Sequence, residues 1–196
     1  MLLSKSEELQ YVACKCIIAF VLENKNNQIL VAKENTIEIL LKLLRSEKTG
    51  LKVILVIVQT IEALCVDVAS VNNSKTQQDL MDQGVFDILI PILEKPPNKT
   101  IQIETAHAIA CLLLGNQKTE EYVNNKLDLK IIVDLLDEAD TRLRLEAGKA
   151  LTTLAYNNTK KQIQIKDLGG LSYTLYEEIL DSEDEMNMCV AAYQVC

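Results

Sequence analysis

Small and apolar residues recur at the spacing 0, 3, 4 and 7 in five places along the chain. These positions share one face of an α-helix, so each stripe predicts a helix that buries a narrow apolar face. The stripes begin 44, 48, 42 and 42 residues apart, an interval typical of helical repeats. Their members are Ala13, Cys16, Ile17 and Phe20; Ile57, Thr60, Ile61 and Leu64; Thr105, Ala108, Ile109 and Leu112; Ala147, Ala150, Leu151 and Leu154; and Cys189, Ala192, Tyr193 and Cys196.

A second signal keeps the same phase, because a leucine-rich pair follows each of the first four stripes. A polar, asparagine-rich turn and a short amphipathic segment lie between each stripe and its pair. Each unit is therefore predicted to contain three helices. An ordinary helical bundle does not explain a fixed period. The pairs are Leu43-Leu44, Ile92-Leu93, Leu135-Leu136 and Ile179-Leu180.

Alanine and cysteine dominate several stripes, and small side chains let helices approach each other closely. Interaxial distances near the lower end of the range of roughly 8 to 10 Å are expected. Gly148 lies beside the fourth stripe. A glycine there lowers helix propensity by about 1 kcal/mol but removes a side chain where two backbones meet.

This pattern resembles the armadillo repeat family, in the segments QQDLMDQGVFDILIPIL and EAGKALTTLA. The resemblance implies an all-α, right-handed solenoid of armadillo repeats with three helices per repeat, covering 1–196 as a single array. The segments would be the third helix of a partial repeat over 7–23, full repeats over 25–67, 73–114 and 117–156, and a last repeat over 158–196 that stops in mid-pattern.

The chain departs from the family pattern at several points. Asn35 and Leu127 replace the glycine that precedes the second helix, and Pro91 is expected to kink its helix or delay its start. About five extra residues fall between Leu64 and Ile92, most simply around VDVASVNNSK, where a loop is expected to protrude. Neither end carries a polar cap, so we expect a piece of a longer armadillo array or a truncated isoform.

Composition narrows the functional classes. The net charge of −8 and pI near 4.8 argue against a general nucleic-acid binder. The apolar run 51–71 is interrupted by Lys52, Glu62 and Asp67, which predicts a buried helix rather than a membrane span. The N-terminus lacks the apolar core of a signal peptide. Six cysteines without CxxC spacing indicate small apolar residues in a reducing compartment, and we expect an intracellular, cytoplasmic protein with the nucleus as the alternative.

The sequence offers little for catalysis. The single histidine, His107, lies among Thr105, Ala106 and Ala108, where a packed or exposed imidazole is expected rather than a general base. No glycine-rich phosphate loop follows a strand, and the cysteines lack metal-ligand spacing. The expectation is therefore no enzyme, no cofactor and no metal site.

The resemblance further implies that stacked third helices line a concave groove, the usual binding surface of the family. The tryptophan and asparagine ladders of its peptide-binding members are absent, which argues against nuclear-import-type cargo. The predicted groove is weakly basic, and an acidic extended segment of another protein is the expected ligand, with each exposed ion pair worth under about 1 kcal/mol. The alternative is a structural spacer with an empty groove. The predicted groove residues are Lys15, Gln59, His107 and Lys149 in one row, and Ala19, Ala63, Cys111 and Thr153 in the next.

Overall fold

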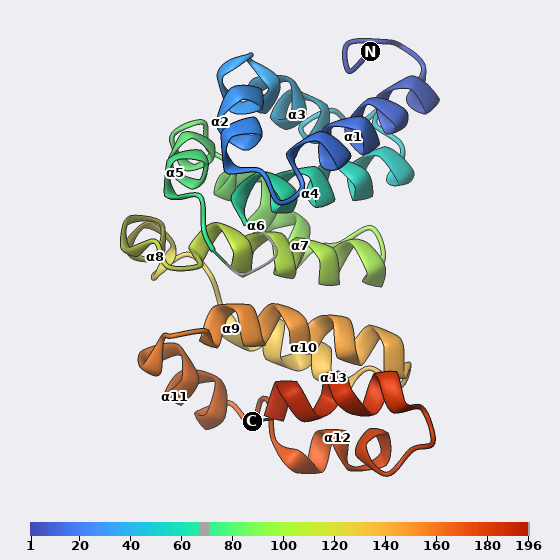
Figure 1. The fold of residues 1–196 in the computed structure, drawn as a ribbon, viewed down its shortest axis with the longest axis vertical. Helices are drawn as coiled ribbons and strands as arrows, with labels where there is room; N and C mark the ends of the chain where they lie inside the picture. The colour runs from blue at the N-terminus through green and yellow to red at the C-terminus, as the bar shows by residue number, and fades with distance from the viewer. Residues whose placement is uncertain (67–70, 196) are drawn as a thin grey trace.

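Five long helices form the spine of the molecule, a computed structural model that describes residues 1–66 and 71–195. Within those residues the chain forms thirteen α-helices and one 3₁₀ helix, and no strand. The first four long helices begin 44, 48 and 42 residues apart, the intervals of the sequence stripes. Figure 1 shows the five stacked as successive layers from the N-terminal to the C-terminal end. They are α1 (Glu7–Val21), α4 (Leu51–Cys65), α7 (Lys99–Leu113), α10 (Thr141–Ala155) and α13 (Glu185–Val195).

Two shorter helices precede each of the last four long helices, which confirms the all-α solenoid of three-helix units. The first helices run along one edge of the molecule (Figure 1); they are α2 (Lys25–Lys33), α5 (Ser74–Asp82), α8 (Gln117–Val123) and α11 (Thr159–Asp167). The second helices are α3 (Thr36–Leu44), α6 (Phe86–Glu94), α9 (Leu129–Val133) with the 3₁₀ helix η1 (Asp134–Asp137), and α12 (Tyr173–Leu180). The repeat boundaries proposed from the sequence stay a prediction.

The asparagine-rich turns start the first helix of every repeat. In each turn an asparagine side chain accepts a hydrogen bond from the backbone N–H three residues later, which satisfies one of the free donors at the helix start. The same residue type recurs because the same cap is needed in each layer. The capping residues are Asn24, Asn73, Asn116 and Asn158.

The turn before the second helix explains the glycine position of the repeat pattern. Gly84 and Gly169 adopt left-handed backbone conformations, with φ of 79° and 84°. Asn35 adopts the same region with φ of 57°, so it fills the glycine's role at the modest strain that asparagine tolerates. Leu127 is followed by Asp128, which caps α9 instead. α6 begins at Phe86 and continues through Pro91, so the expected delay of the helix start is wrong.

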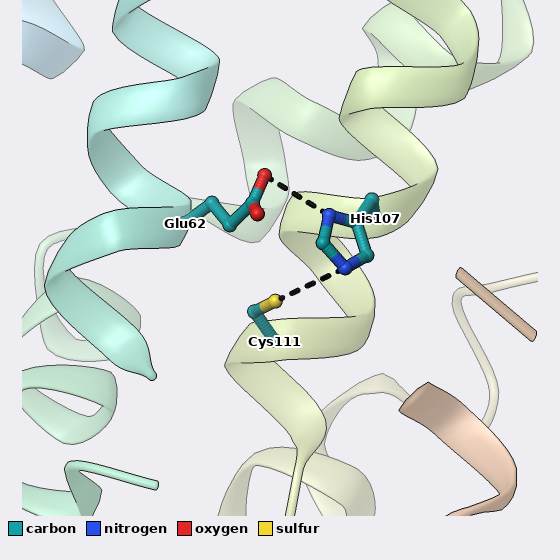
Figure 2. Close-up of side chains that lie close together, drawn as sticks. All are labelled: Glu62, His107 and Cys111. Atoms are coloured by element: carbon teal, nitrogen blue, oxygen red, sulfur yellow. Dashed lines mark hydrogen bonds and ion pairs between the residues drawn. The ribbon is translucent and has the colours of Figure 1, made fainter. Parts of the chain in front are cut away.

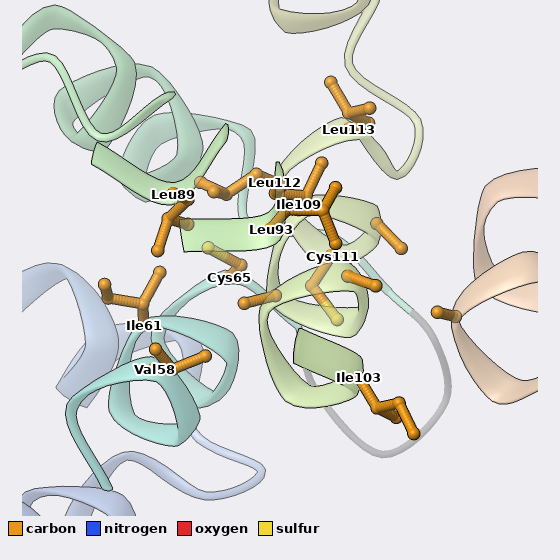
Figure 3. Packing of buried hydrophobic residues seen from close by; sticks show 14 of the residues in the cluster. Val58, Ile61, Cys65, Leu89, Leu93, Ile103, Ile109, Cys111, Leu112 and Leu113 are labelled. Atoms are coloured by element: carbon orange, nitrogen blue, oxygen red, sulfur yellow. The ribbon is translucent and has the colours of Figure 1, made fainter. Parts of the chain in front are cut away.

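The predicted stripes form the core in the middle of the array. All members of the second, third and fourth stripes are buried, and Figure 3 shows Ile61, Ile109 and Leu112 packed with side chains of α6. The two terminal stripes differ: Phe20 is 50% exposed and Tyr193 is 69% exposed. Cys196, the last member of the fifth stripe, lies outside the described residues.

A ladder of buried amide side chains joins successive repeats along the edge of first helices. Gln77 on α5 donates to the carbonyls of Cys111 and Leu114 at the end of α7, at 2.7 and 3.0 Å. Its Oε1 accepts from Asn116 Nδ2 of the next repeat at 3.1 Å. The preceding layer repeats this arrangement: Gln28 donates to Ala63 and Val66, and Asn73 donates to Gln28.

The ladder changes chemistry in the next layer, where Glu120 occupies the position of Gln77. Asn158 Nδ2 still donates to Glu120 Oε1 at 3.0 Å, so the link between repeats is kept. A carboxylate has no N–H, however, and cannot donate to the corresponding carbonyls of Thr153 and Tyr156 at the end of α10. Glu120 lines a small cavity together with both residues.

The residues on either side of the expected insertion between Leu64 and Ile92 are joined by backbone hydrogen bonds. Val66 and Asn72 form an isolated antiparallel bridge, and the backbone N–H of Asn73 donates to the carbonyl of Cys65 at 2.7 Å. The expected protruding loop, with Asp67, falls on residues 67–70 and lies outside the described residues. No helix within the described part of the chain combines the length and apolarity needed to cross a membrane.

Candidate functional site

A groove of about 630 Å³, lined by both polar and apolar side chains, runs along the third helices. α1, α4, α7 and α10 all contribute side chains to it, and Tyr193 of α13 closes one end. Because every layer offers one exposed stretch of its third helix, the groove crosses the repeats rather than lying within one of them. Its polar lining residues are Lys15, Gln59, Glu62, Glu104, His107, Glu146, Lys149, Thr152 and Thr153.

Seven of the eight groove residues expected from the sequence line this groove. The first row, Lys15, Gln59, His107 and Lys149, is brought together along it. The second row contributes Ala63, Cys111 and Thr153. Ala19 is exposed and is not among the lining side chains of the described residues. Whether these residues contact a partner stays a proposal.

The hydrogen bonds across the groove do not all join residues of the first predicted row, Lys15, Gln59, His107 and Lys149. Lys15 Nζ donates to Gln59 Oε1 at 3.1 Å, as neighbouring positions of one row would. Gln59 Nε2 then donates to Glu104 Oε1 at 3.1 Å, and not to His107. Glu104 precedes His107 by one helical turn, so α7 contacts α4 one turn away from the alignment of the stripes.

Three carboxylates in the groove were missed by the sequence analysis: Glu62, Glu104 and Glu146. Two lysines, Lys15 and Lys149, are the only full cations against them in the groove lining. The expectation of a weakly basic groove is therefore wrong, and it no longer supports an acidic partner. The signal was available, because each glutamate lies three residues from a predicted groove position and so one turn away on the same helix face.

The pKa values of Glu62 and Glu104 are shifted in opposite directions, although burial opposes ionisation of both. Burial opposes ionisation of Glu62, but the hydrogen bond and charge of His107, with the charge of Lys149, outweigh it and lower the Glu62 pKa. Burial raises the pKa of Glu104, and the nearby charge of Glu62 adds to this effect against the hydrogen bond from Gln59. A cation placed beside Glu104 would therefore favour its ionised form.

His107 lies on the floor of the groove and is only 7% exposed. Its Nδ1 donates to Glu62 Oε2 at 3.0 Å, and its Nε2 lies 3.8 Å from Cys111 Sγ, as Figure 2 shows. With the proton on Nδ1, Nε2 is the acceptor for the thiol. Burial raises the pKa of Cys111 well above its usual value, and the charge of Glu62 adds to it, so the protonated thiol is favoured over a nucleophilic thiolate.

Among the described residues, the same three side chains form a group that could hold a metal ion. One donor atom from each of Glu62, His107 and Cys111 lies within 4.8 Å of the others. The spacing of cysteines along the chain, on which the expectation of no metal site rested, cannot reveal a set of ligands assembled across two helices. The described cysteines are all free thiols: Cys14, Cys65 and Cys111 are buried, whereas Cys16 and Cys189 are exposed.

Comparisons with known proteins agree with this architecture. The chain is 29% identical over its full length to the mouse ankyrin and armadillo repeat-containing protein, and 30% identical over 163 residues, 82% of its length, to the human protein of that name. It spans only 13% and 11% of the lengths of these relatives. No protein-family model matches the sequence.

Solved structures show the fold. A designed armadillo repeat protein in complex with the peptide (KR)4 matches with a TM-score of 0.73 at 22% identity, over 100% of this chain and 79% of the other. The armadillo repeats only protein from Plasmodium falciparum matches with a TM-score of 0.62 at 13% identity, over 94% of this chain and 78% of the other. The chain therefore has the armadillo-repeat fold, and the resemblance seen in its sequence is confirmed.

Proposed function

We propose that the chain is a non-catalytic protein-interaction module whose groove binds an extended, basic segment of another protein. The observation that carries this proposal is the placement of Glu62, Glu104 and Glu146 on three successive third helices. An extended peptide advances by about 3.3 Å per residue, so successive layers roughly 10 Å apart would meet side chains about three residues apart.

The charges of the groove favour cationic side chains over anionic ones. Three carboxylates face two lysines, and Lys15 is already hydrogen-bonded to Gln59. A partner lysine or arginine near Glu104 would stabilise the ionised carboxylate, whose pKa burial now raises. The designed armadillo protein solved with a (KR)4 peptide has the same fold, which supports this choice of ligand chemistry.

Peptide binding measured by fluorescence anisotropy tests the proposal. Three labelled peptides of equal length are compared: alternating Lys and Arg, alternating Glu and Ser, and a neutral Gly and Ser peptide. The basic peptide is expected to bind, and the other two to bind at least 10-fold more weakly. Substituting Glu62, Glu104 and Glu146 by Gln should weaken basic-peptide binding by about 10- to 100-fold, because three partly exposed pairs contribute up to about 1 kcal/mol each.

The matched control changes the same net charge away from the groove. Glu34, Glu38 and Glu47 are exposed and do not line it. Their triple substitution by Gln should leave affinity within about 2-fold at physiological salt, since distant surface charges are screened. Equal losses in both triple variants would show that net charge, not the groove, attracts the peptide.

Reversing the charge of the two groove lysines distinguishes a basic partner from an acidic one. The double substitution of Lys15 and Lys149 by Glu should tighten binding of the basic peptide. Tight binding of the acidic peptide by the original protein, lost in this double variant, would overturn the basic-segment proposal in favour of an acidic ligand.

The structural spacer remains the second candidate, because the groove already satisfies several of its own polar groups. Lys15, Gln59 and Glu104 form one hydrogen-bonded chain across three layers. Failure of all three peptides to bind would favour the spacer. Pull-down of the intact parent protein with and without these repeats would then show whether any partner depends on them.

A further inference from the structure

Two neighbouring third helices bring three metal-ligating side chains of different type to one point in the groove. Glu62 comes from α4, and His107 and Cys111 lie one turn apart on α7. Their donor atoms lie within 4.8 Å of one another, and Figure 2 shows the carboxylate and the thiol on either side of the imidazole. The i, i+4 spacing on one helix places the second and third donors on the same face.

We propose that this cluster is a binding site for one Zn²⁺ ion. A carboxylate oxygen of Glu62, one ring nitrogen of His107 and the Cys111 thiolate are the protein ligands. The fourth position faces the groove, where a water molecule completes the coordination shell. This pattern of three protein ligands and one open position is that of exchangeable zinc sites rather than closed structural ones.

With one donor atom from each residue, the three donors lie within 4.8 Å of one another, which is longer than the ion requires. Ligands at about 2.0 to 2.3 Å in a tetrahedron around Zn²⁺ lie roughly 3.3 to 3.7 Å apart. Glu62 Oε2 and His107 Nδ1 are 3.0 Å apart, and Cys111 Sγ and His107 Nε2 are 3.8 Å apart. These two contacts are made by different ring nitrogens, so coordination of one ion needs the side chains to rotate until one nitrogen faces both partners.

Charge balance also favours a dication. Binding converts the Cys111 thiol to a thiolate and releases its proton to the solvent, while the imidazole stays neutral with its proton on the nitrogen that does not bind the ion. The thiolate and the Glu62 carboxylate then neutralise the two charges of Zn²⁺. A neutral assembly avoids most of the penalty for an isolated charge at a position where Cys111 is 2% exposed.

Imidazole and thiolate donors select Zn²⁺ over the hard cations Mg²⁺ and Ca²⁺, which prefer sets of oxygen ligands. The charge of Lys149 acts on both Glu62 and Cys111 and opposes the ion. The charge of Glu104 acts on Cys111 in the opposite sense and attracts the ion.

Titration with Co²⁺, followed by displacement with Zn²⁺, tests the proposal. The protein carries Ser at Cys16, Cys189 and Cys196 to remove thiols outside the cluster that bind metal adventitiously. We expect one equivalent of Co²⁺ to give a thiolate-to-cobalt charge-transfer absorption, which one equivalent of Zn²⁺ abolishes. Mg²⁺ at the same concentration should not compete.

Variants in the same background assign the ligands. Cys111→Ala should abolish the charge-transfer absorption, and His107→Ala should weaken Zn²⁺ binding by at least 10-fold. Cys14→Ala is the matched control, because Cys14 is also a fully buried helical thiol but lies on α1. It should bind Zn²⁺ like its parent. Circular dichroism and thermal melting establish that each variant is folded.

Either of two results would overturn the proposal. One is the absence of a thiolate charge-transfer band with Co²⁺ in the parent background, a measurement that needs no cluster variant. The other is Zn²⁺ affinity unchanged by His107→Ala. If Cys111→Ala does not fold, these two measurements still decide the matter. Peptide binding is not read in this experiment, so the groove proposal stands or fails separately.

Discussion

The α7 and α10 layers are built from the same repeat pattern but differ in how completely they are buried. Twelve of the fifteen residues of α7 are buried, against six of the fifteen residues of α10. At the end of α7 the amide of Gln77 satisfies two carbonyls, whereas at the end of α10 Glu120 offers no donor. Shared hydrophobic spacing thus specifies the layer, and the polar residue at this one position decides whether the carbonyls at the end of the third helix receive a side-chain donor.

Removing the buried amide of Gln77 at the end of α7 should cause the largest loss of stability. Gln77→Leu removes donors from the carbonyls of Cys111 and Leu114 and an acceptor from Asn116, all in a buried environment. We expect a loss of about 3 kcal/mol in the free energy of unfolding, measured by urea denaturation. Gln162→Leu is the control: Gln162 is exposed and donates only to Ala155, so its loss should stay under about 1 kcal/mol.

In the α10 layer, stability should be most sensitive to a substitution at Gly148. A Cβ at this position would collide with the side-chain oxygens of Gln194 and Tyr176, which pack against α10. Gly148→Ala should therefore lower the free energy of unfolding by about 2 kcal/mol despite the better helix propensity of alanine. Adding Gln194→Ala should restore part of the loss, and an equal or larger loss in the double variant would rule out the collision as the cause.

Replacing Glu120 by an amide residue should reduce the difference in stability between the α7 and α10 layers. Glu120→Gln supplies an amide that can donate to the carbonyls of Thr153 and Tyr156 while still accepting from Asn158. A gain of about 1 kcal/mol in the free energy of unfolding is expected. Slower amide hydrogen exchange in α10 would locate the gain. Unchanged exchange in α10 would show that this edge does not limit its opening.

Acidification should have the smallest of these effects on stability, and it should act through Glu62 on α4. The folded-state pKa of Glu62 lies below its ordinary value of 4.5. A lowered folded-state pKa gives stability that is present above the unfolded-state pKa and is lost as the pH falls through the folded-state pKa. Glu62→Gln should therefore cost under about 1 kcal/mol at pH 7, and this difference should shrink as the pH falls below 4.5 and through the lower folded-state pKa.

Particular residues show what the sequence could and could not predict. The stripes at Ile57, Thr105 and Ala147 gave the third helices and their intervals, because a repeated burial pattern is visible as spacing. The amide ladder also leaves a trace, since Asn24 and Gln28, and Asn73 and Gln77, share one spacing. That spacing does not state which carbonyls the amides reach.

The groove was predicted less completely than the fold. Its first row was found, but the contact of Gln59 with Glu104 depends on how α7 is displaced along α4, which no spacing within one helix records. The cluster of Glu62, His107 and Cys111 depends on the same displacement. Contacts within a helix follow from periodicity, whereas contacts between helices require the three-dimensional packing.

The amide ladder also limits the ways in which the repeats can slide. Helices lined with alanine present shallow surfaces, and a neighbouring layer shifted by one turn would still bury apolar groups. Such a shift would separate Asn73 from Gln28 and Asn116 from Gln77, and would leave these buried amide groups without their hydrogen-bond partners. The two amide pairs therefore fix the alignment of neighbouring repeats, and this alignment keeps the glutamates of successive layers along one groove.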